Sequence, residues 1–233
     1  MKPFRFQKFE VQQSKNVFRV GTDAVLLGVL ANVDGAKRVL EIGVGTGIIS
    51  LMLAQRNSQA HFVGLDIDEN AARLANQNFS ESIFSQRMHV LCEDFNRFSA
   101  EEKFDFIVSN PPYFEASDSE KDKKARQMIL LNFEQLLYGA EQHLTDEGIV
   151  SLIVPYHVTK SLLTIGLNCG LYLNRKVNIY GIIEAEVPKR VVLEFSRIKK
   201  EVKEENFVIE SAPRVYSQDY LEATKDFHIF KYN

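Results

Sequence analysis

Leu40-Glu-Ile-Gly-Val-Gly-Thr-Gly47 links a short apolar run, VLEI, to the apolar helical pattern ISLMLAQR that follows it. A glycine-rich turn between a strand and a helix lets the backbone approach a ligand where a Cβ atom would clash, and the helix start points N–H groups at that ligand. The spacing is G-x-G-x-G, with Ile48 where the dinucleotide fingerprint has its third glycine, so a nicotinamide site is disfavoured. The turn predicts a ligand site, and a purely structural turn is the alternative.

Outward from this turn, apolar runs alternate with helical patterns. We predict strands over residues 39–42, 62–67, 88–92, 104–109 and 149–155, and helices over 49–56, 69–79, 127–144 and 157–167. Nearly continuous apolar strands spaced by helices indicate a parallel sheet covered on both faces. Two further predicted strands, 176–180 and 190–195, have no helix between them, which predicts an antiparallel hairpin at the sheet edge. The sequence therefore predicts an α/β fold with a seven-stranded, mostly parallel sheet.

The domain organisation is expected to be simple. We predict one α/β domain over residues 37–198, an N-terminal extension over 1–36, and a polar C-terminal tail over 199–233 packed on the same domain. The link between the two hairpin strands, 181–189, is long enough to be a functional loop.

The composition limits the classes to which the protein can belong. The chain has 233 residues, of which 45% are hydrophobic and 25% charged, which is typical of a globular protein. The run AVLLGVLA over residues 24–31 falls far short of the roughly 20 apolar residues of a transmembrane helix. Charges in MKPFRFQKFE replace the apolar region of a signal peptide, so we expect a cytoplasmic protein with no membrane partner. Asn78-Phe-Ser80 then matches the glycosylation pattern by chance.

Metal and nucleophile chemistry have little support in the sequence. Cys92 and Cys169 have no neighbouring Cys or His at metal-ligand spacing, and we expect no metal. The five histidines are scattered, and no G-x-S-x-G elbow is present.

Charge is unevenly distributed along the chain. The net charge is −3, but residues 1–20 hold five basic side chains against one acid, and residues 186–203 hold six against three. Residues 61–120 hold twelve acids and four bases. Basic ends that flank an acidic middle can orient an anionic polymer despite the negative total, and a solvated charged face is the alternative.

Two acidic positions follow the glycine turn. Asp66, in GLDID, ends the second predicted strand, where a carboxylate can accept both hydroxyls of a ribose. Asp68 and Glu69 are better explained as acids at a helix N-terminus. Asp94 and Phe95 close the third strand and could take the amine and the face of an adenine ring, with a solvated turn acid and a core phenylalanine as the alternatives. Together these positions favour a nucleoside cofactor.

Ser109-Asn-Pro-Pro-Tyr-Phe114 directly follows the fourth predicted strand. The two prolines have fixed φ and bias Asn110 to an extended conformation, so the loop is stiff. It offers two neutral acceptors, the Asn110 side-chain oxygen and the Pro111 carbonyl, beside the Tyr113 ring. Such a set suits a planar –NH₂ group, because accepting both protons discourages delocalisation of the nitrogen lone pair and makes the amine a better nucleophile. A simple turn is the alternative.

These motifs, in this order, resemble the class I S-adenosylmethionine-dependent methyltransferases that methylate amino groups on planar substrates. FRFQKFEVQQ and FRVGTDAVLLG within residues 4–28, NPPYF (110–114), FEQLLYGAEQHL (133–144) and PKRVVLEF (188–195) are similar to a narrower bacterial group. Members of that group are tRNA N6-adenine methyltransferases that modify nucleotide 37, beside the anticodon, of a valine tRNA. The resemblance implies a Rossmann-like methyltransferase fold in which the N-terminal extension covers the cofactor site.

The resemblance also implies roles for individual residues. S-adenosylmethionine is the implied cofactor, with Asp66 at its ribose and Asp94 at its adenine amine. The implied cofactor-binding set is Thr22, Asp23, Glu41, Gly43, Gly45, Gly47, Asp66, Ile67, Asp94, Phe95 and Asn110. The implied catalytic set, which binds the target adenine, is Asn110, Pro111, Pro112 and Tyr113.

A tRNA substrate would need phosphate contacts, and we expect a monomer that binds the anticodon stem-loop. The candidate contacts are the basic side chains Arg5, Lys8, Lys15, Arg126, Lys189 and Arg190.

Three other functions stay open at this point. Asn-Pro-Pro-Tyr also suits a glutamine amide, as in the enzymes that methylate translation release factors, and it suits adenine in DNA. The third is a non-catalytic module that binds S-adenosylmethionine or RNA.

Overall fold

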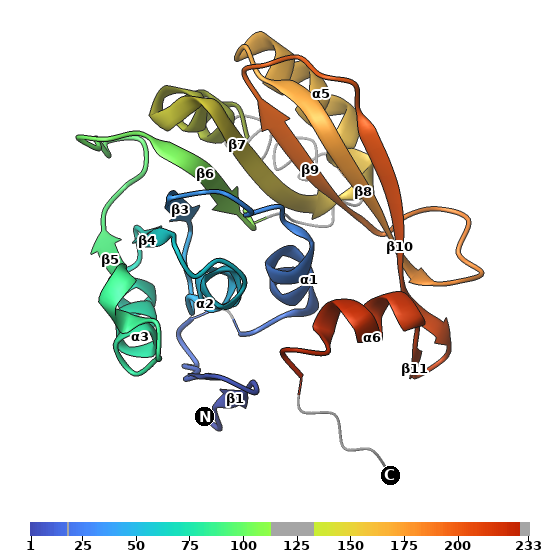
Figure 1. The fold of residues 1–233 in the computed structure, drawn as a ribbon, viewed down its shortest axis with the longest axis horizontal. Helices are drawn as coiled ribbons and strands as arrows, with labels where there is room; N and C mark the ends of the chain where they lie inside the picture. The colour runs from blue at the N-terminus through green and yellow to red at the C-terminus, as the bar shows by residue number, and fades with distance from the viewer. Residues whose placement is uncertain (18, 113–132, 229–233) are drawn as a thin grey trace, which may run out of the picture.

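The computed structural model describes residues 1–17, 19–112 and 133–228. Within these residues the chain forms a large sheet with helices on both faces and a small N-terminal hairpin (Figure 1). The strands are β1 Phe4–Arg5, β2 Glu10–Val11, β3 Arg38–Ile42, β4 His61–Asp66, β5 Met88–Cys92, β6 Phe104–Ser109, β7 Leu144–Pro155, β8 Tyr172–Ile182, β9 Arg190–Ser196, β10 Lys203–Ala212 and β11 Val215–Tyr216. The helices are α1 Thr22–Leu30, α2 Ile48–Arg56, α3 Glu69–Ser80, α5 Thr159–Asn168 and α6 Gln218–Thr224, with a further helical stretch over residues 133–143.

The main sheet has the order β11-β10-β8-β9-β7-β6-β3-β4-β5 over the described residues. Strands β3 to β7 run parallel, whereas β9 is antiparallel to both of its neighbours. The predicted mostly parallel α/β sheet is confirmed. The sheet has nine strands instead of seven, because residues of the predicted tail form β10 and β11.

The predicted hairpin of β8 and β9 is present, but it does not lie at the sheet edge. Strand β10 pairs parallel with β8 along the register from Lys203↔Arg175 to Glu210↔Ile182 and so covers it. Strand β11 then pairs with β10 and forms the edge. The polar composition of β10, whose residues are mostly exposed or half-buried, concealed this strand from sequence analysis.

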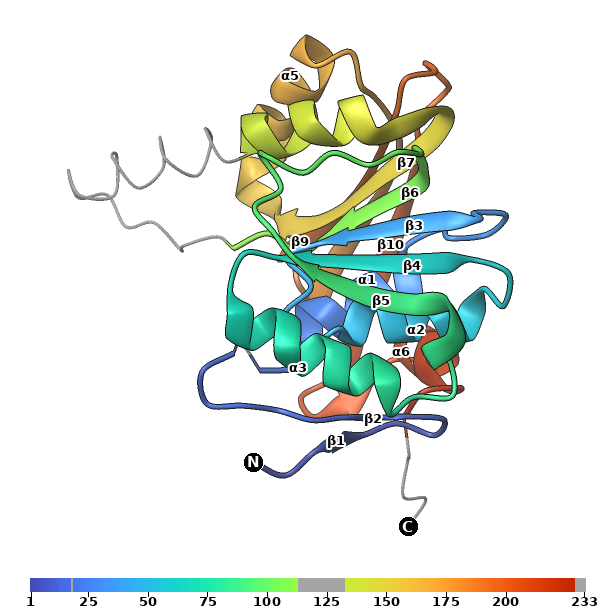
Figure 2. The ribbon, with the colours of Figure 1, turned by 90° about the vertical axis from the view of Figure 1, so that its left-hand side faces the viewer.

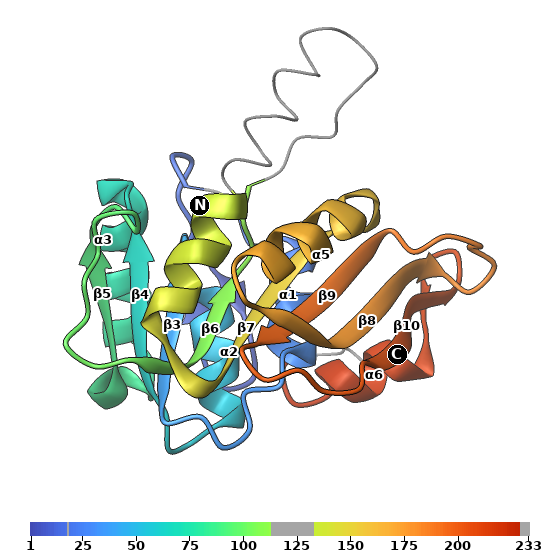
Figure 3. The ribbon, with the colours of Figure 1, turned by 90° about the horizontal axis from the view of Figure 1, so that it is seen from above.

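Two apolar layers sandwich the sheet. On one face the core contains side chains of α1, α2, α3 and α6, packed on alternate strand residues such as Val39, Phe106 and Val192. On the other face residues 133–143 and α5 pack on the intervening strand residues, such as Leu40, Ile107 and Leu193 (Figure 3). The alternation follows from the strand period of two, and it explains why the parallel strands are apolar throughout.

The N-terminal hairpin contacts the segment that follows α6. The hairpin of β1 and β2 lies below α3 (Figure 2), and the backbone N–H of Gln7 donates to the Phe227 carbonyl at 2.9 Å. The Gln7 side chain also donates to the carbonyls of Lys225 and His228. Phe6 and His228 stack with their ring centroids 6.0 Å apart. The N-terminal hairpin is therefore docked on the segment that follows α6.

Candidate active site

The site begins with the turn between β3 and α2. Gly43, Gly45 and Gly47 all have positive φ, at 73°, 54° and 78°, which L side chains rarely adopt. A Cβ atom on Gly47 would lie 2.5 Å from the Phe79 ring, so packing as well as conformation requires this glycine. By contrast, nothing lies within 4 Å of the Cβ position of Gly43. The turn therefore leaves open space beside the end of β3.

Asp66 closes this turn from the neighbouring strand. One of its carboxylate oxygens accepts from the Gly45 backbone N–H at 2.9 Å, and the other accepts from the Asp68 N–H at 3.0 Å. The carboxylate is thus fixed at the carboxyl end of β4, directly beside the glycine turn. Ile67, the next residue in the predicted cofactor set, is 70% exposed.

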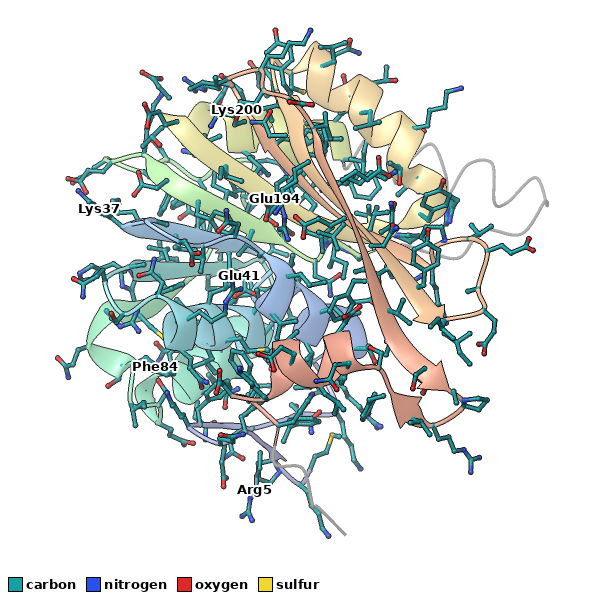
Figure 4. All side chains as sticks on the ribbon, turned by 45° about the vertical axis from the view of Figure 1, so that its right-hand side comes forward. Arg5, Lys37, Glu41, Phe84, Glu194 and Lys200 are labelled. Carbon is teal, nitrogen blue, oxygen red and sulfur yellow. The ribbon has the colours of Figure 1, made fainter. Side chains whose placement is uncertain are left out.

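Glu41 lies inside the molecule under the turn (Figure 4). It is 1% exposed, and its carboxylate accepts from the backbone N–H of Ser50, at 2.9 Å, and from the Ser50 hydroxyl. Burial raises the pKa of Glu41 from 4.5 to about 8. In this structure Glu41 ties β3 to the first turn of α2, which fixes both ends of the glycine turn.

The Asn-Pro-Pro segment lies beside the glycine turn through strand register. Ser109, the last residue of β6, pairs with Ile42, the last residue of β3, and its hydroxyl donates to the Ile42 carbonyl at 2.7 Å. The next residues of the two strands, Asn110 and Gly43, therefore lie next to each other. Asn110 and Pro111 are half-buried and Pro112 is exposed, while Tyr113 lies outside the described residues.

The contacts of Asp94 and Phe95 are those expected of a turn acid and a core phenylalanine. Asp94 is half-buried, and its carboxylate accepts from the Asn96 backbone N–H at 3.0 Å, as a turn-capping acid does. The Phe95 ring packs on the helix of residues 133–143, where a Cβ atom on Gly139 would lie 2.7 Å from it. Their cofactor roles stay a prediction.

Thr22 and Asp23 start α1 on the N-terminal side of the site. Thr22 is exposed, whereas Asp23 forms an ion pair with Arg190, with 2.9 Å between Oδ2 and Nε. Arg190 begins β9 opposite Pro155 of β7, so it lies at the same sheet edge as Asn110. Two residues expected to bind different ligands are therefore bonded to each other, and the pair joins α1 to the sheet.

Comparison with known proteins decides the family. The family model described as "Methyltransferase small domain" matches residues 8–165. A tRNA1(Val) (adenine(37)-N6)-methyltransferase of a Flavobacteriaceae bacterium (strain 3519-10) is 49% identical over 99% of this chain and 100% of its own length. The chain belongs to the tRNA1(Val) (adenine(37)-N6)-methyltransferase family. The enzyme of the same name from Bacteroides fragilis is 38% identical over 97% of each chain.

Solved structures agree on the fold of this methyltransferase. A predicted O-methyltransferase from Agrobacterium tumefaciens superposes with a TM-score of 0.70 over 88% of this chain and 96% of that chain, at 18% identity. A methyltransferase from Pyrococcus furiosus superposes with a TM-score of 0.62 over 81% of this chain and 89% of that chain, also at 18% identity. The predicted class I methyltransferase fold is thereby confirmed.

The basic residues proposed for tRNA are placed unequally in this methyltransferase. Lys8, Lys15 and Lys189 are exposed, and Arg5 is exposed but pairs with Glu10 at 2.9 Å in the N-terminal hairpin (Figure 4). Arg190 forms the ion pair with Asp23 described above, and Arg126 lies outside the described residues. In the part of the chain that the structure describes, no cluster of three or more His, Cys, Asp or Glu could hold a metal ion. None of the helices described there is long and apolar enough to span a membrane.

One further residue, Asn78, supports this site, and the motifs of the sequence do not indicate its role. It is fully buried on α3 and bonds to the carbonyl of Thr46 in the glycine turn, at 2.8 Å. A signal was present, because Asn78 falls four and three residues after the buried Leu74 and Ala75, on the apolar side of the helix. A polar residue in an apolar stripe indicates a buried hydrogen-bonding role.

Proposed function

We propose that the protein transfers a methyl group from S-adenosylmethionine to the N6 amine of adenine 37 in tRNA1(Val). The observation that carries this proposal is the register Ile42↔Ser109, which brings Asn110 next to the glycine turn. An N-methyltransferase needs hydrogen-bond acceptors for the target amine next to a turn that binds the nucleoside cofactor, and both lie at one edge of the sheet here. The family adds the identity of the substrate.

The residues present fit the cofactor. The open space at Gly43 admits a ligand where a side chain would fill it, and Asp66 stands beside it for the ribose hydroxyls. Bound S-adenosylmethionine supplies a methyl group made electrophilic by its sulfonium. The remaining implied cofactor residues are Thr22, Asp23, Glu41, Ile67, Asp94 and Phe95, and their roles belong to this proposal.

The chain's own contribution is to hold the amine. Asn110 and the Pro111 carbonyl accept its two N–H groups, and the prolines keep both acceptors in place before the substrate arrives. Tyr113 would stack on the adenine ring. Positioning of this kind supplies ~7–11 kcal/mol without a general base, because the methylated ammonium loses its proton to water. An adenine in an anticodon loop is already outside a duplex, so little unstacking is needed.

The tRNA would contact basic side chains from several segments of the chain. Lys189 lies at the sheet edge that carries the site, and Lys8 and Lys15 lie on the N-terminal segment. Arg5, Arg126 and Arg190 complete the proposed set. Phosphate contacts release counterions, so binding should weaken steeply as salt rises, and a salt-insensitive binding constant would contradict them. We further propose that the extension 1–36 covers the cofactor and that the enzyme acts as a cytoplasmic monomer. Of the predicted tail 199–233, residues 203–212 and 215–216 are strands of the sheet itself.

The test is a transfer assay with labelled S-adenosylmethionine and purified protein. Its four substrates are tRNA1(Val), the same tRNA with guanine at position 37, a translation release factor, and duplex DNA. We expect label on the first alone. Label on the release factor would reassign the target to a glutamine amide, label on DNA would reassign it to DNA adenine, and binding of S-adenosylmethionine without any transfer would leave a non-catalytic module.

A further inference from the structure

Asn78 joins three parts of the molecule through one buried side chain. Its Oδ1 accepts from the backbone N–H of Gln12 at 2.8 Å, and its Nδ2 donates to the Gln12 carbonyl at 3.2 Å. The same Nδ2 donates to the Thr46 carbonyl at 2.8 Å. The amide therefore pairs with Gln12 as a neighbouring strand would, while its second N–H reaches the glycine turn.

Both partners matter for the cofactor site. Thr46 stands between Gly45, whose N–H donates to Asp66, and Gly47, which caps α2. Gln12 opens the segment that leads to Thr22 at the start of α1. Asn78 thus holds the N-terminal segment against the turn that Asp66 closes.

A second contact on the same segment supports this arrangement. Val17 is buried against Ala71 and Leu74 of α3, one to two turns before Asn78. Residues 12–17 are therefore fixed to α3 at both of their ends, once by hydrogen bonds and once by apolar packing. We call residues 12–17 the strap.

We propose that Asn78 is a positioning residue that sets the affinity for the nucleoside cofactor by fixing the strap and the Thr46 carbonyl together. The inference rests on the proposed function only in taking the glycine turn as a cofactor site. Asn78 does not belong to the segment that holds the target amine. Its loss should therefore act on cofactor binding and leave the rate of transfer at saturation nearly unchanged.

The experiment measures the Kd for S-adenosylhomocysteine by calorimetry, and KM and kcat with tRNA1(Val), in Asn78→Ala and Asn78→Asp. Alanine leaves the N–H and the carbonyl of the half-buried Gln12 and the carbonyl of the buried Thr46 without this partner, so we expect Kd to rise about tenfold while kcat stays within about twofold. Aspartate keeps the acceptor for Gln12 but turns both donors into an acceptor that faces two carbonyls, so its effect should be larger. Hydrogen exchange in the strap should rise in both variants.

Asn57 provides a matched control. It is also buried, its Nδ2 donates to the carbonyls of Val33 and Ala36, and it caps the far end of α2. Asn57→Ala should destabilise the fold about as much as Asn78→Ala and leave Kd unchanged. Equal rises in Kd in both variants would show a general loss of stability and overturn the proposal.

If Asn78→Ala fails to fold, Val17→Ala decides, because it loosens the strap without unpaired polar groups. A raised Kd in Val17→Ala supports the proposal, and an unchanged Kd overturns it. A wild-type protein that binds S-adenosylhomocysteine but methylates no tRNA contradicts the proposed function alone, since Kd still tests Asn78. A wild-type protein that does not bind S-adenosylhomocysteine overturns both.

Discussion

The two halves of the sheet are held together by different means. In the half formed by β3, β4, β5 and β6, the site is shaped by backbone geometry: three glycines at positive φ, and strand ends in register. In the half formed by β8, β9 and β10, ion pairs link the strands, and Arg175 bonds to Glu205 at 2.8 Å and to Glu194 at 3.2 Å. The first half carries the proposed cofactor site, and ion pairs stabilise the second half.

Arg175 and Glu194 of the second half also bond to α1 and to the residues after it. Arg175 donates to the Leu30 carbonyl at the end of this helix, and Glu194 accepts from the Asn32 N–H, both at 2.8 Å. Asp23, at the start of the same helix, pairs with Arg190. Strand β9 therefore holds both ends of α1. Substitutions in the first half should therefore alter methyl transfer, and substitutions in the second half should alter the free energy of unfolding.

The largest effect is expected at Asn110. Asn110→Ala removes one of two acceptors for the target amine, so kcat should fall by about 10²–10³-fold while the Kd for the cofactor stays nearly constant. Asn178, buried on β8, is the matched control in the second half, and Asn178→Ala should keep kcat. Near-normal turnover in purified Asn110→Ala would contradict the site.

The next effect is on stability, at Glu194. This carboxylate is 3% exposed, and its removal leaves the Arg175 guanidinium with one carboxylate partner fewer. Glu194→Ala should lower the free energy of unfolding by about 3–5 kcal/mol, measured by urea denaturation, because it breaks a buried ion pair. The folded enzyme should keep its kcat. Glu69→Ala, which removes an exposed pair with Arg73, should change the free energy of unfolding little. Equal losses of stability in the two variants would contradict a stabilising role of the Arg175–Glu194 pair.

Glu41 in the first half and Glu205 in the second half should make the free energy of unfolding respond to pH in opposite directions. The pKa of Glu41 is raised from 4.5 to about 8 by burial, so its contribution to stability is full below about pH 4.5 and is lost as pH rises toward 8. A hydrogen bond from Arg175 lowers the pKa of Glu205 from 4.5 to about 2, so its contribution is full above about pH 4.5 and is lost as pH falls toward 2.

Urea unfolding across the pH range tests both signs. Glu41→Gln should flatten the profile between about pH 4.5 and 8, and Glu205→Gln should flatten it below about pH 4.5. Profiles that stay parallel to the wild type in both variants would show that neither carboxylate titrates as described.

The smallest effect concerns the pair that joins α1 to β9, Asp23 and Arg190. A double-mutant cycle with Asp23→Asn and Arg190→Gln should give a coupling of about 1 kcal/mol in the free energy of unfolding, because both side chains are mostly buried. The exposed pair of Arg5 and Glu10 should give almost none. A coupling of zero at Asp23 and Arg190 would show that this ion pair does not stabilise the attachment of α1 to β9.

The sequence predicted the half with β3, β4, β5 and β6 better than the half with β8, β9 and β10. Strands β5 and β6 have the predicted ends, because apolar runs bounded by polar residues mark buried parallel strands. Helix α1 was missed since its buried residues surround the helix and leave no periodic pattern. Strand β10 was missed because its residues are largely exposed or half-buried.

The site divides in the same way. The glycine turn, Asp66 and Asn110 could be placed from sequence because each follows a strand, and parallel strands end at one edge. The pairing of Asp23 with Arg190 joins positions 167 residues apart, and no spacing rule covers such a distance. Asn78 bonds to backbone groups, which any sequence offers, so its partners leave no mark in the residue pattern.

The contact of Gln7 with Phe227 has a consequence for synthesis. A ribosome makes the β1–β2 hairpin well before the carbonyl groups of Lys225, Phe227 and His228 that dock it, since Lys225 follows Gln7 by 218 positions. The hairpin therefore docks only after residues 225–228 have been synthesised, so a nascent polypeptide that stops before them lacks that anchor. Removing α6 together with residues 225–228 would thus loosen a hairpin that lies far from them in the sequence.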